Sequence, residues 1–270
     1  MQISSADYQR FKIVLEKQSG ILLGENKQYL VASRLSNLLK DNNLDSFSQL
    51  IEQISTVRGN QLLKQVVDRM TTNETLWFRD RYPFDYLKTN IIPALKSSKR
   101  RIRIWCAACS TGQEPYSVAM QLADMGILTE VEIVATDLSE RVLKKAQEGI
   151  YQQIELNRGL SQVNLKKYLS PLDDGTWQVK PQMRNKIRFQ PLNLLTTPYL
   201  LGSFDVIFCR NVLIYFSGEN KSQVLKGLVD KLNPNAYLFL GASEALTRDT
   251  QGLTMVRCNP GLVYQKQISG

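Results

Sequence analysis

Residues 101–125 read RIRIWCAACSTGQEPYSVAMQLADM, and this stretch decides the fold. Its first eight residues alternate and then run apolar, as expected for a β-strand that is buried on both faces. The small residues of CSTG predict a tight loop. A helix is expected from about Pro115 to Met125, because proline suits the first turn of a helix. A strand, a loop of small residues and a helix in this order are typical of a parallel α/β sheet.

Strands and helices continue to alternate after this stretch. Strands are predicted at residues 131–137, 204–210 and 236–242, and helices over 139–149 and 218–232. Such alternation predicts a doubly wound parallel sheet with helices on its faces.

The segment from Tyr151 to about Gln190 breaks this alternation. It is rich in Gln, Asn and Lys, and Asp174-Gly175 lies between two short apolar stretches. Asp-Gly in that setting is a hairpin signal. We therefore expect a small antiparallel β insertion at about 151–190 within the α/β domain.

The N-terminal part of the chain has a different pattern. Its apolar residues recur at helical spacing, and alternating β-branched residues are almost absent. Asp45 or Ser46 is expected to cap a short helix that follows. The predicted organisation is an all-α N-terminal domain over 1–79, a linker helix over 80–100, and an α/β domain over 101–270.

The amino-acid composition excludes several classes of reaction and of metal site. The 270 residues contain no histidine, which excludes Ser-His-Asp and Cys-His hydrolysis and histidine-containing metal sites. The net charge of +9 favours an anionic partner such as nucleic acid, a membrane surface or an acidic protein, and it serves equally well for solubility alone. No apolar run approaches the ~20 residues of a membrane helix, and the N-terminus does not resemble a secretory signal. A cytoplasmic protein without membrane insertion is expected.

In a doubly wound sheet, ligands bind at the carboxyl ends of the strands. The candidate segments are therefore Ala108–Glu114, Thr136–Asp137, Asn193–Leu194 and Arg210–Tyr215. Small residues in the first segment let a ligand approach the backbone closely. Asp137 suits the hydroxyls of a ribose, although an acid at this place also serves as a helix cap or turn residue. An adenosine-containing cofactor is the favoured ligand.

Charge distinguishes among such cofactors. The first loop lacks G-x-G-x-x-G, which disfavours NAD and FAD. Glu114 would repel a diphosphate and is better suited to hydroxyls or a cation. S-adenosylmethionine fits this pattern, because it carries a ribose, an ammonium and a sulfonium group. A surface carboxylate without a ligand is the alternative interpretation of Glu114.

Five motifs in order resemble the CheR-type chemoreceptor glutamate methyltransferases, and the resemblance covers nearly the whole chain. The motifs are TTNETLWFR (71–79), WCAACSTGQEPYS (105–117), ATD (135–137), NLL (193–195) and CRNVLIYF (209–216). The resemblance implies an all-α domain followed by a Rossmann-like S-adenosylmethionine methyltransferase domain with a small β insertion. It also implies S-adenosylmethionine as methyl donor, S-adenosylhomocysteine as product and no metal. The implied acceptors are glutamates on the cytoplasmic helical bundle of methyl-accepting chemoreceptors, which are methylated in chemotaxis adaptation.

The resemblance further implies which residues form the site. The implied cofactor contacts are Asn73, Thr75, Arg79, Glu114, Asp137, Asn193, Leu194, Asn211 and Val212. Tyr215 would lie near the transferring methyl group, with Arg79 as a cationic neighbour of the incoming carboxylate. Outside this context, Arg79 would be read as part of a surface ion pair and Tyr215 as a core aromatic.

The absence of histidine agrees with this chemistry. A glutamate carboxylate is ionised at pH 7, so its attack on a sulfonium methyl group requires no proton removal. The protein has only to align the reacting atoms and partly desolvate the carboxylate.

The cysteines, the basic charge and the cofactor motifs each bear on an alternative interpretation. Cys106 and Cys109 have the spacing of a zinc or redox pair, but further ligands with suitable spacing are missing, so both are expected to be small packing residues. A nucleic-acid methyltransferase would also be basic, yet the sequence shows no basic patch interleaved with aromatics. An adaptor that has lost catalysis would have eroded cofactor motifs, and these are intact. We therefore expect a monomer that acts on receptors and not on nucleic acid.

The β insertion bears on targeting. In some family members it adds a strand to a tethering peptide at the receptor C-terminus, a case of β-augmentation. The turn at Asp173–Gly175 is short, which favours a member that does not depend on the tether.

Overall fold

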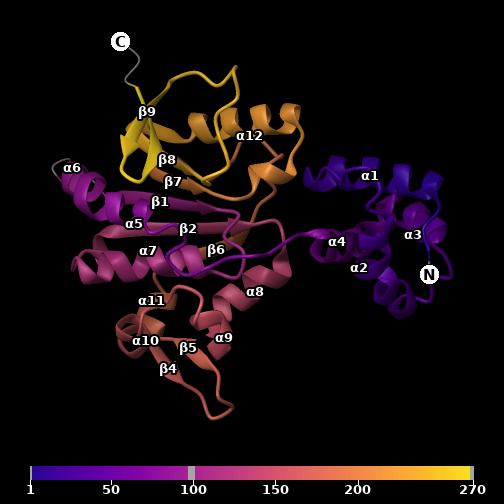
Figure 1. The fold of residues 1–270 in the computed structure, drawn as a ribbon, viewed down its shortest axis with the longest axis horizontal. Coiled ribbons are helices and arrows are strands. Elements are labelled where there is room, and N and C mark those ends of the chain that lie inside the picture. The colour runs from indigo at the N-terminus through magenta and orange to yellow at the C-terminus, as the bar shows by residue number, and fades with distance from the viewer. Residues whose placement is uncertain (1, 97–100, 268–270) are drawn as a thin grey trace. The chain divides into compact units, whose positions relative to one another are not determined.

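The computed structural model describes residues 2–96 and 101–267, and the chain forms two compact units (Figure 1). The helical unit comprises Met1–Thr72 and Tyr215–Lys221, and the sheet unit comprises Asn73–Ile214 and Ser222–Gly270. None of the helices in the described ranges combines the length and the apolar character that a bilayer crossing requires.

The helical unit confirms the predicted all-α N-terminal region. Its helices are α1 (Ser5–Ser19), α2 (Gln28–Asp41), α3 (Phe47–Ile54) and α4 (Asn60–Met70), with a 3₁₀ turn at Val57–Gly59. Of the two predicted caps for α3, Ser46 is the one used, since its side chain accepts the N–H of Gln49. The apolar stripes meet in a common core that includes Tyr8, Phe11, Val31, Leu35 and Leu50.

A later stretch of the chain, Tyr215–Lys221, also belongs to the helical unit. The N–H of Leu22 donates to the carbonyl of Tyr215 at 2.8 Å, and Asn220 Nδ2 donates to Glu16 Oε1 at 3.5 Å. The helical unit is therefore built from two separate pieces of sequence.

A mixed sheet forms the centre of the sheet unit, and seven strands within the described residues take the order β6-β2-β1-β7-β8-β10-β9. The strands are β1 (Ile102–Ala107), β2 (Val131–Asp137), β6 (Ile187–Pro191), β7 (Phe204–Cys209), β8 (Leu232–Leu240), β9 (Leu253–Cys258) and β10 (Gly261–Lys266). The predicted parallel arrangement is confirmed from β6 to β8, whereas β10 joins β8 antiparallel and pairs with β9 as a hairpin.

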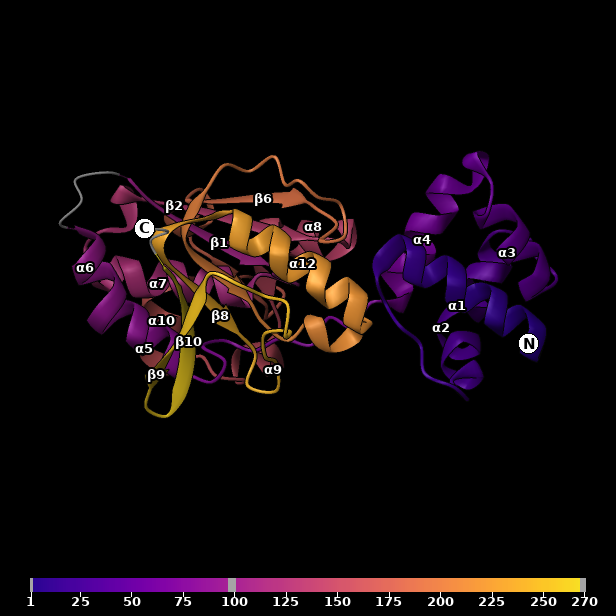
Figure 2. The same ribbon diagram turned by 90° about the horizontal axis from the view of Figure 1, so that it is seen from above.

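Helices accompany this sheet. They are α5 (Tyr82–Tyr86), a π-helical stretch at Leu87–Ile91, α6 (Ile92–Lys96), α7 (Gln113–Asp124), a 3₁₀ turn at Leu128–Glu130, α8 (Glu140–Glu148), a 3₁₀ turn at Leu213–Tyr215, and α12 (Gly218–Asp230). The end of the predicted linker helix, at residues 97–100, lies outside the described residues. In Figure 2, α12 and the β9–β10 hairpin lie nearest the viewer.

The register of the parallel strands determines where a site can form. Ala107, the last residue of β1, pairs with Thr136 of β2 on one side and with Cys209 of β7 on the other. The segments that follow these strands therefore start side by side at one edge of the sheet, as the sequence predicts for its candidate segments.

The expected β insertion is a small antiparallel sheet in the order β3-β5-β4. Its elements are β3 (Ile150–Tyr151), α9 (Gln153–Leu156), α10 (Gln162–Tyr168), β4 (Leu169–Pro171), β5 (Trp177–Val179) and α11 (Pro181–Arg184). The hairpin signal is confirmed, because Gly175, with a φ of 81°, lies in the turn between β4 and β5. Residues 187–190, grouped with the insertion from the sequence, instead form part of β6 and pair with β2 in the large sheet.

Candidate functional site

The loop between β1 and α7 departs from ordinary backbone conformations. Ala108, Ser110 and Gly112 have φ values of 59°, 51° and 97°. For residues other than glycine, sparsely populated conformations cost about 1–3 kcal/mol each and cluster at functional sites. The N–H of Cys109 donates to the Thr136 carbonyl at 2.9 Å and so ties the loop to the end of β2. The loop expected to approach a ligand is thus a strained one.

Asp137, at the end of β2, holds the same loop. Its carboxylate accepts the N–H of Ser110 at 2.8 Å and the N–H of Ser139 at 3.0 Å. Ser139 in turn caps α8, within the stretch 139–149 where the sequence predicts a helix. The structure therefore shows a turn-forming role for Asp137. A carboxylate has about four acceptor positions, so this role is compatible with the ribose contact as well.

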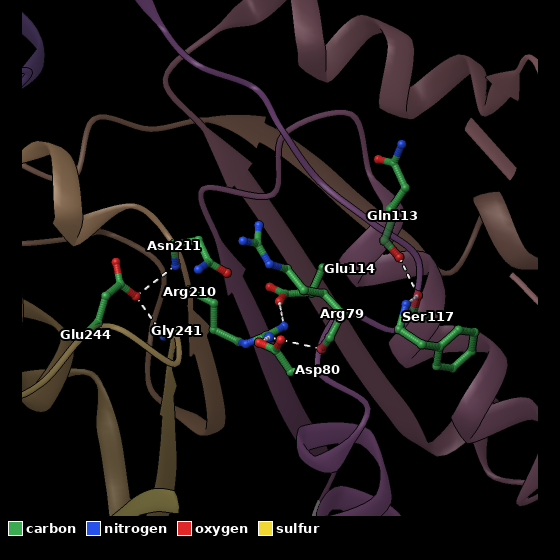
Figure 3. Close-up of polar contacts among 10 residues, drawn as sticks. Arg79, Asp80, Gln113, Glu114, Ser117, Arg210, Asn211, Gly241 and Glu244 are labelled. Atoms are coloured by element: carbon green, nitrogen blue, oxygen red, sulfur yellow. Dashed lines mark hydrogen bonds and ion pairs between the residues drawn. The ribbon is translucent and has the colours of Figure 1, made fainter. Parts of the chain in front are cut away.

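A buried arginine joins three segments at this edge (Figure 3). Arg210 follows β7, and its side chain is 1% exposed. Its Nη1 donates to Glu114 Oε2 at 2.8 Å, whereas its Nη2 donates to Asp80 Oδ2 at 2.6 Å and to the Arg79 carbonyl at 3.0 Å. Charge-assisted bonds of this kind are strong and directional. Arg210 therefore fixes the start of α7 and the segment around Arg79 against the end of β7.

Glu114 lies in the first turn of α7, with a side chain that is 12% exposed. Burial raises the pKa of its carboxyl above the ordinary value, and the guanidinium groups of Arg210 and Arg79 oppose that rise. A carboxylate in such a place gains from hydroxyl donors or a further cation, because each favours the ionised form.

Arg79 comes from a second segment with unusual backbone angles. Phe78, Asp80 and Arg81 have φ values of 48°, 65° and 51°. The N–H of Phe78 donates to Ser117 Oγ of α7 at 3.0 Å, which anchors the segment on that helix. The strained turn thus brings the Arg79 guanidinium into the electrostatic environment of Glu114.

Glu244 was not predicted from the sequence, and it organises the neighbouring loop (Figure 3). Its Oε2 accepts the N–H of Asn211 at 2.8 Å and the N–H of Gly241 at 2.7 Å, and its Oε1 accepts the N–H of Ile214 at 3.2 Å. Asn211 has a φ of 59°. A Cβ on Gly241 would lie 2.7 Å from Glu244 Oε2, so glycine is required for this close approach. The available signal was an acid shortly after the apolar strand that ends at Leu240.

The remaining predicted residues differ in their contacts with this edge of the sheet. The carbonyl of Asn73 accepts Ser110 Oγ at 2.9 Å, which brings Asn73 to the β1–α7 loop. Asn193 and the buried Leu194 follow β6 directly after Leu192, whose N–H donates to the Asp137 carbonyl at 3.0 Å.

Three further predicted residues lie beside these in the sequence. Thr75 and Val212 are partly exposed and lie in the same two loops as Asn73 and Asn211. Tyr215 groups with the helical unit.

The cysteines do not have the character of ligands. Cys106 and Cys109 are free and buried in the core, and burial raises the pKa of both thiols well above the ordinary value. Zinc requires the thiolate form, which such burial disfavours. Within residues 2–96 and 101–267, no group of three or more Cys, Asp and Glu side chains has the arrangement of a metal site.

These observations define the ligand that the edge can hold. Glu114 and Asp137 offer acceptors to hydroxyl groups or a cation, and Arg79 offers a cation to a carboxylate. The buried Nε of Arg210 has no hydrogen-bond partner among the described residues, which leaves a donor that a bound group can satisfy. A nucleoside with a zwitterionic tail fits this set, whereas a diphosphate would meet the carboxylate of Glu114.

Two family models match the chain. The CheR methyltransferase all-alpha domain matches residues 6–71, and the CheR methyltransferase SAM binding domain matches residues 73–262. Together the two matches cover both the N-terminal helices and all predicted site residues.

Curated proteins are similar over nearly the full length. The chain is 48% identical to chemotaxis protein methyltransferase 1 of Pseudomonas aeruginosa, over 98% of this chain and 99% of that protein. It is 48% identical to chemotaxis protein methyltransferase 1 of Vibrio cholerae, with 97% and 98% covered. It is 34% identical to the chemotaxis protein methyltransferase of Escherichia coli, with 90% and 86% covered.

Proposed function

Because the chain belongs to the CheR methyltransferase family, we propose that it transfers a methyl group from S-adenosylmethionine to glutamate side chains of membrane chemoreceptors. The products are glutamate methyl esters and S-adenosylhomocysteine. One observation carries the proposal at the level of residues. Within the matched SAM binding domain, Arg210 brings Arg79 and Glu114 to the edge of the sheet where such folds bind ligands.

The proposed contacts follow from the chemistry of each side chain. Glu114 and Asp137 accept hydroxyl and ammonium donors of the cofactor. Asn193-Leu194 and Asn211-Val212 line the adenine and the methionine part, and Asn73 and Thr75 complete the contacts. Arg79 touches the cofactor and orients the incoming carboxylate. For Tyr215 we keep the role implied by the resemblance, next to the methyl group being transferred.

The protein contributes to the reaction mainly by positioning the reacting groups. S-adenosylmethionine supplies an electrophilic methyl group, which an acceptor carboxylate oxygen takes as the carbon–sulfur bond breaks and its electron pair stays on sulfur. No proton moves, which agrees with a chain that contains no histidine. Arg79 and Tyr215 hold the carboxylate in line, and such positioning is worth about 7 kcal/mol or more. An ion pair that is too strong would weaken the nucleophile, so both groups act as positioning groups.

The partner is proposed to be the cytoplasmic helical bundle of a methyl-accepting chemoreceptor, with the protein acting as a cytoplasmic monomer. The +9 net charge favours an acidic acceptor surface. Independence from a receptor tether stays a prediction, and micromolar binding of a receptor tail peptide would contradict it.

The test combines purified protein, methyl-labelled S-adenosylmethionine and receptor-containing membranes, followed by mild alkali. A carboxyl methyl ester hydrolyses and releases its label as volatile methanol, whereas N-methyl groups are retained. We expect alkali-labile label on the receptor, and we expect Arg79→Ala to abolish it.

Arg188→Ala is the matched control, since Arg188 lies on β6 of the same unit with a side chain that is 54% exposed. It is expected to keep wild-type labelling. Alkali-stable label, or label on RNA, would overturn the assignment of the acceptor.

A further inference from the structure

The segment Asn73–Arg79, here called the connecting segment, lies against the β insertion. The N–H of Trp77 donates to the carbonyl of Arg158 at 3.1 Å, between α9 and α10 of the insertion. The side chain of Arg158 also pairs with Glu74 of the connecting segment. Both side chains of this pair are about half exposed, so the ion pair itself contributes little. The backbone contact is the one that defines the geometry.

Gly159 makes that contact possible. It has a φ of 102°, and a Cβ on this residue would lie 2.1 Å from the Trp77 carbonyl oxygen and 3.1 Å from its carbon. The atoms in the way are backbone, which cannot rotate aside as a side-chain end can. Any residue other than glycine must therefore push the connecting segment away from the insertion.

Other contacts prevent Trp77 from moving independently. Its side chain is 1% exposed and meets the ring of Tyr151 of β3 edge-on, with centroids 5.0 Å apart. The ring of Tyr116 of α7 stacks on it at 6.4 Å. Trp77 is thus held between the insertion and α7, two residues before Arg79.

A few hydrogen bonds would transmit a displacement of Trp77 to the candidate site. Phe78 is bound to Ser117, and the Arg79 carbonyl is bound to Arg210, which also holds Glu114. At the other end of the connecting segment, Asn73 is bound to the β1–α7 loop. A shift of the segment at Trp77 therefore changes the position of the implied cofactor contacts Thr75 and Arg79.

We propose that Arg158 and Gly159 of the β insertion are positioning residues for the cofactor site, because they set the path of the connecting segment. The insertion is then a working part of S-adenosylmethionine binding, besides any role in targeting. This inference rests on the proposed function, since it requires that the connecting segment contacts the cofactor.

The test compares Gly159→Ala with Gly175→Ala in the full chain. Gly175 has a similar φ of 81° in the same insertion, but a Cβ there meets nothing within 4 Å. Both variants strain a left-handed backbone, and only Gly159→Ala displaces Trp77. The measurements are S-adenosylmethionine affinity by calorimetry and thermal unfolding of each variant.

We expect Gly159→Ala to weaken S-adenosylmethionine binding by about tenfold or more, because displacing the connecting segment weakens the charge-assisted contact of Arg79 with the cofactor. Gly175→Ala is expected to bind within about twofold of wild type, since its added methyl group is in open space. Equal affinities of the two variants would overturn the inference. Failure of the wild-type chain to bind S-adenosylmethionine would instead refute the proposed function.

If Gly159→Ala does not fold, Tyr151→Leu is compared with Tyr151→Phe. Both changes remove the hydroxyl that donates to the Thr111 carbonyl, and only Tyr151→Leu also removes the ring that meets Trp77 edge-on. We expect Tyr151→Leu to bind S-adenosylmethionine more weakly than Tyr151→Phe by about threefold or more. Equal affinities of these two variants would contradict the inference.

Discussion

The helical unit and the edge of the sheet unit that carries the site follow different local rules. In the helical unit, the residues other than glycine with a positive φ are Asn26 and Asn43, within the described residues. Asparagine adopts this conformation readily. At the sheet edge, the residues with a positive φ include Phe78, Ala108 and Ser110, which do so only under constraint.

Charge follows the same division. In the helical unit, the side chains of the ion pair between Arg69 and Asp41 are 37% and 62% exposed. At the sheet edge, Arg210 is buried between two carboxylates. Strained backbone and buried charge are thus concentrated at the edge of the sheet that is expected to bind a ligand, whereas the helical unit has regular backbone conformations. Substitutions at the edge should therefore affect binding, and substitutions in helices α1 to α4 should affect stability alone.

The largest expected effect is that of Arg210→Met. It leaves the buried Glu114 without its cation, and breaking a buried pair costs about 3–5 kcal/mol. Arg69→Met, in the helical unit, removes a pair with a 37% exposed arginine and should cost less than about 1 kcal/mol. Urea unfolding of the two variants measures the difference. Similar losses of unfolding free energy in the two variants would contradict the comparison.

A second contrast uses two glycines without a positive φ. Gly241→Ala places a methyl group 2.7 Å from Glu244 Oε2 and 2.9 Å from the N–H nitrogen of Asn211. It should cost about 1–3 kcal/mol by overpacking and weaken S-adenosylmethionine binding. Gly218→Ala, at the start of α12 in the helical unit, meets nothing within 4 Å and should leave binding unchanged. Calorimetry with the cofactor distinguishes the two, and weakened binding in Gly218→Ala would count against the division.

The pH dependence of cofactor binding tests Glu114. Because burial raises the pKa of its carboxyl, protonation on acidification starts above the ordinary range of a glutamate. If Glu114 accepts cofactor donors, affinity falls as the pH drops through that raised pKa, by at most about 1.4 kcal/mol per pH unit for one proton.

Glu114→Gln should bind more weakly at pH 7 and should lose this dependence above the ordinary titration range of a glutamate. The absence of histidine removes the usual competing group from that range. An unchanged pH profile in Glu114→Gln would show that another group titrates.

The smallest expected effect belongs to the helical unit. Ser46→Ala removes the bond from the Gln49 N–H at the start of α3 and should cost about 1 kcal/mol of stability. S-adenosylmethionine affinity should stay at the wild-type value, as measured on the same samples. A loss of affinity without a loss of stability would contradict the comparison, because it would show that α3 takes part in cofactor binding.

Local features were predictable because they depend on neighbours in sequence. The cap at Ser46, the hairpin at Gly175 and the alternation of strands and helices all follow from capping preference, turn chemistry and periodicity. The strand β6 was not predicted, because its pairing with β2 is decided by the tertiary fold and not by its own short sequence.

The site was predictable only in part, for the same reason. The motifs brought attention to Glu114 and Asp137, whereas no motif gave a role to Arg210 or Glu244. Arg210 bonds to Glu114 and Asp80, which are 96 and 130 residues away in sequence. Only the order of the strands brings such partners together.

The two-piece construction of the helical unit has a consequence for synthesis. Residues 1–72 leave the ribosome first, but Tyr215–Lys221 follow only about 140 residues later, which at roughly 5–20 residues per second is a delay of about 7–30 s. Until then, the N–H of Leu22 lacks its native acceptor on Tyr215. The helical unit therefore reaches its final form only after most of the sheet unit has been made.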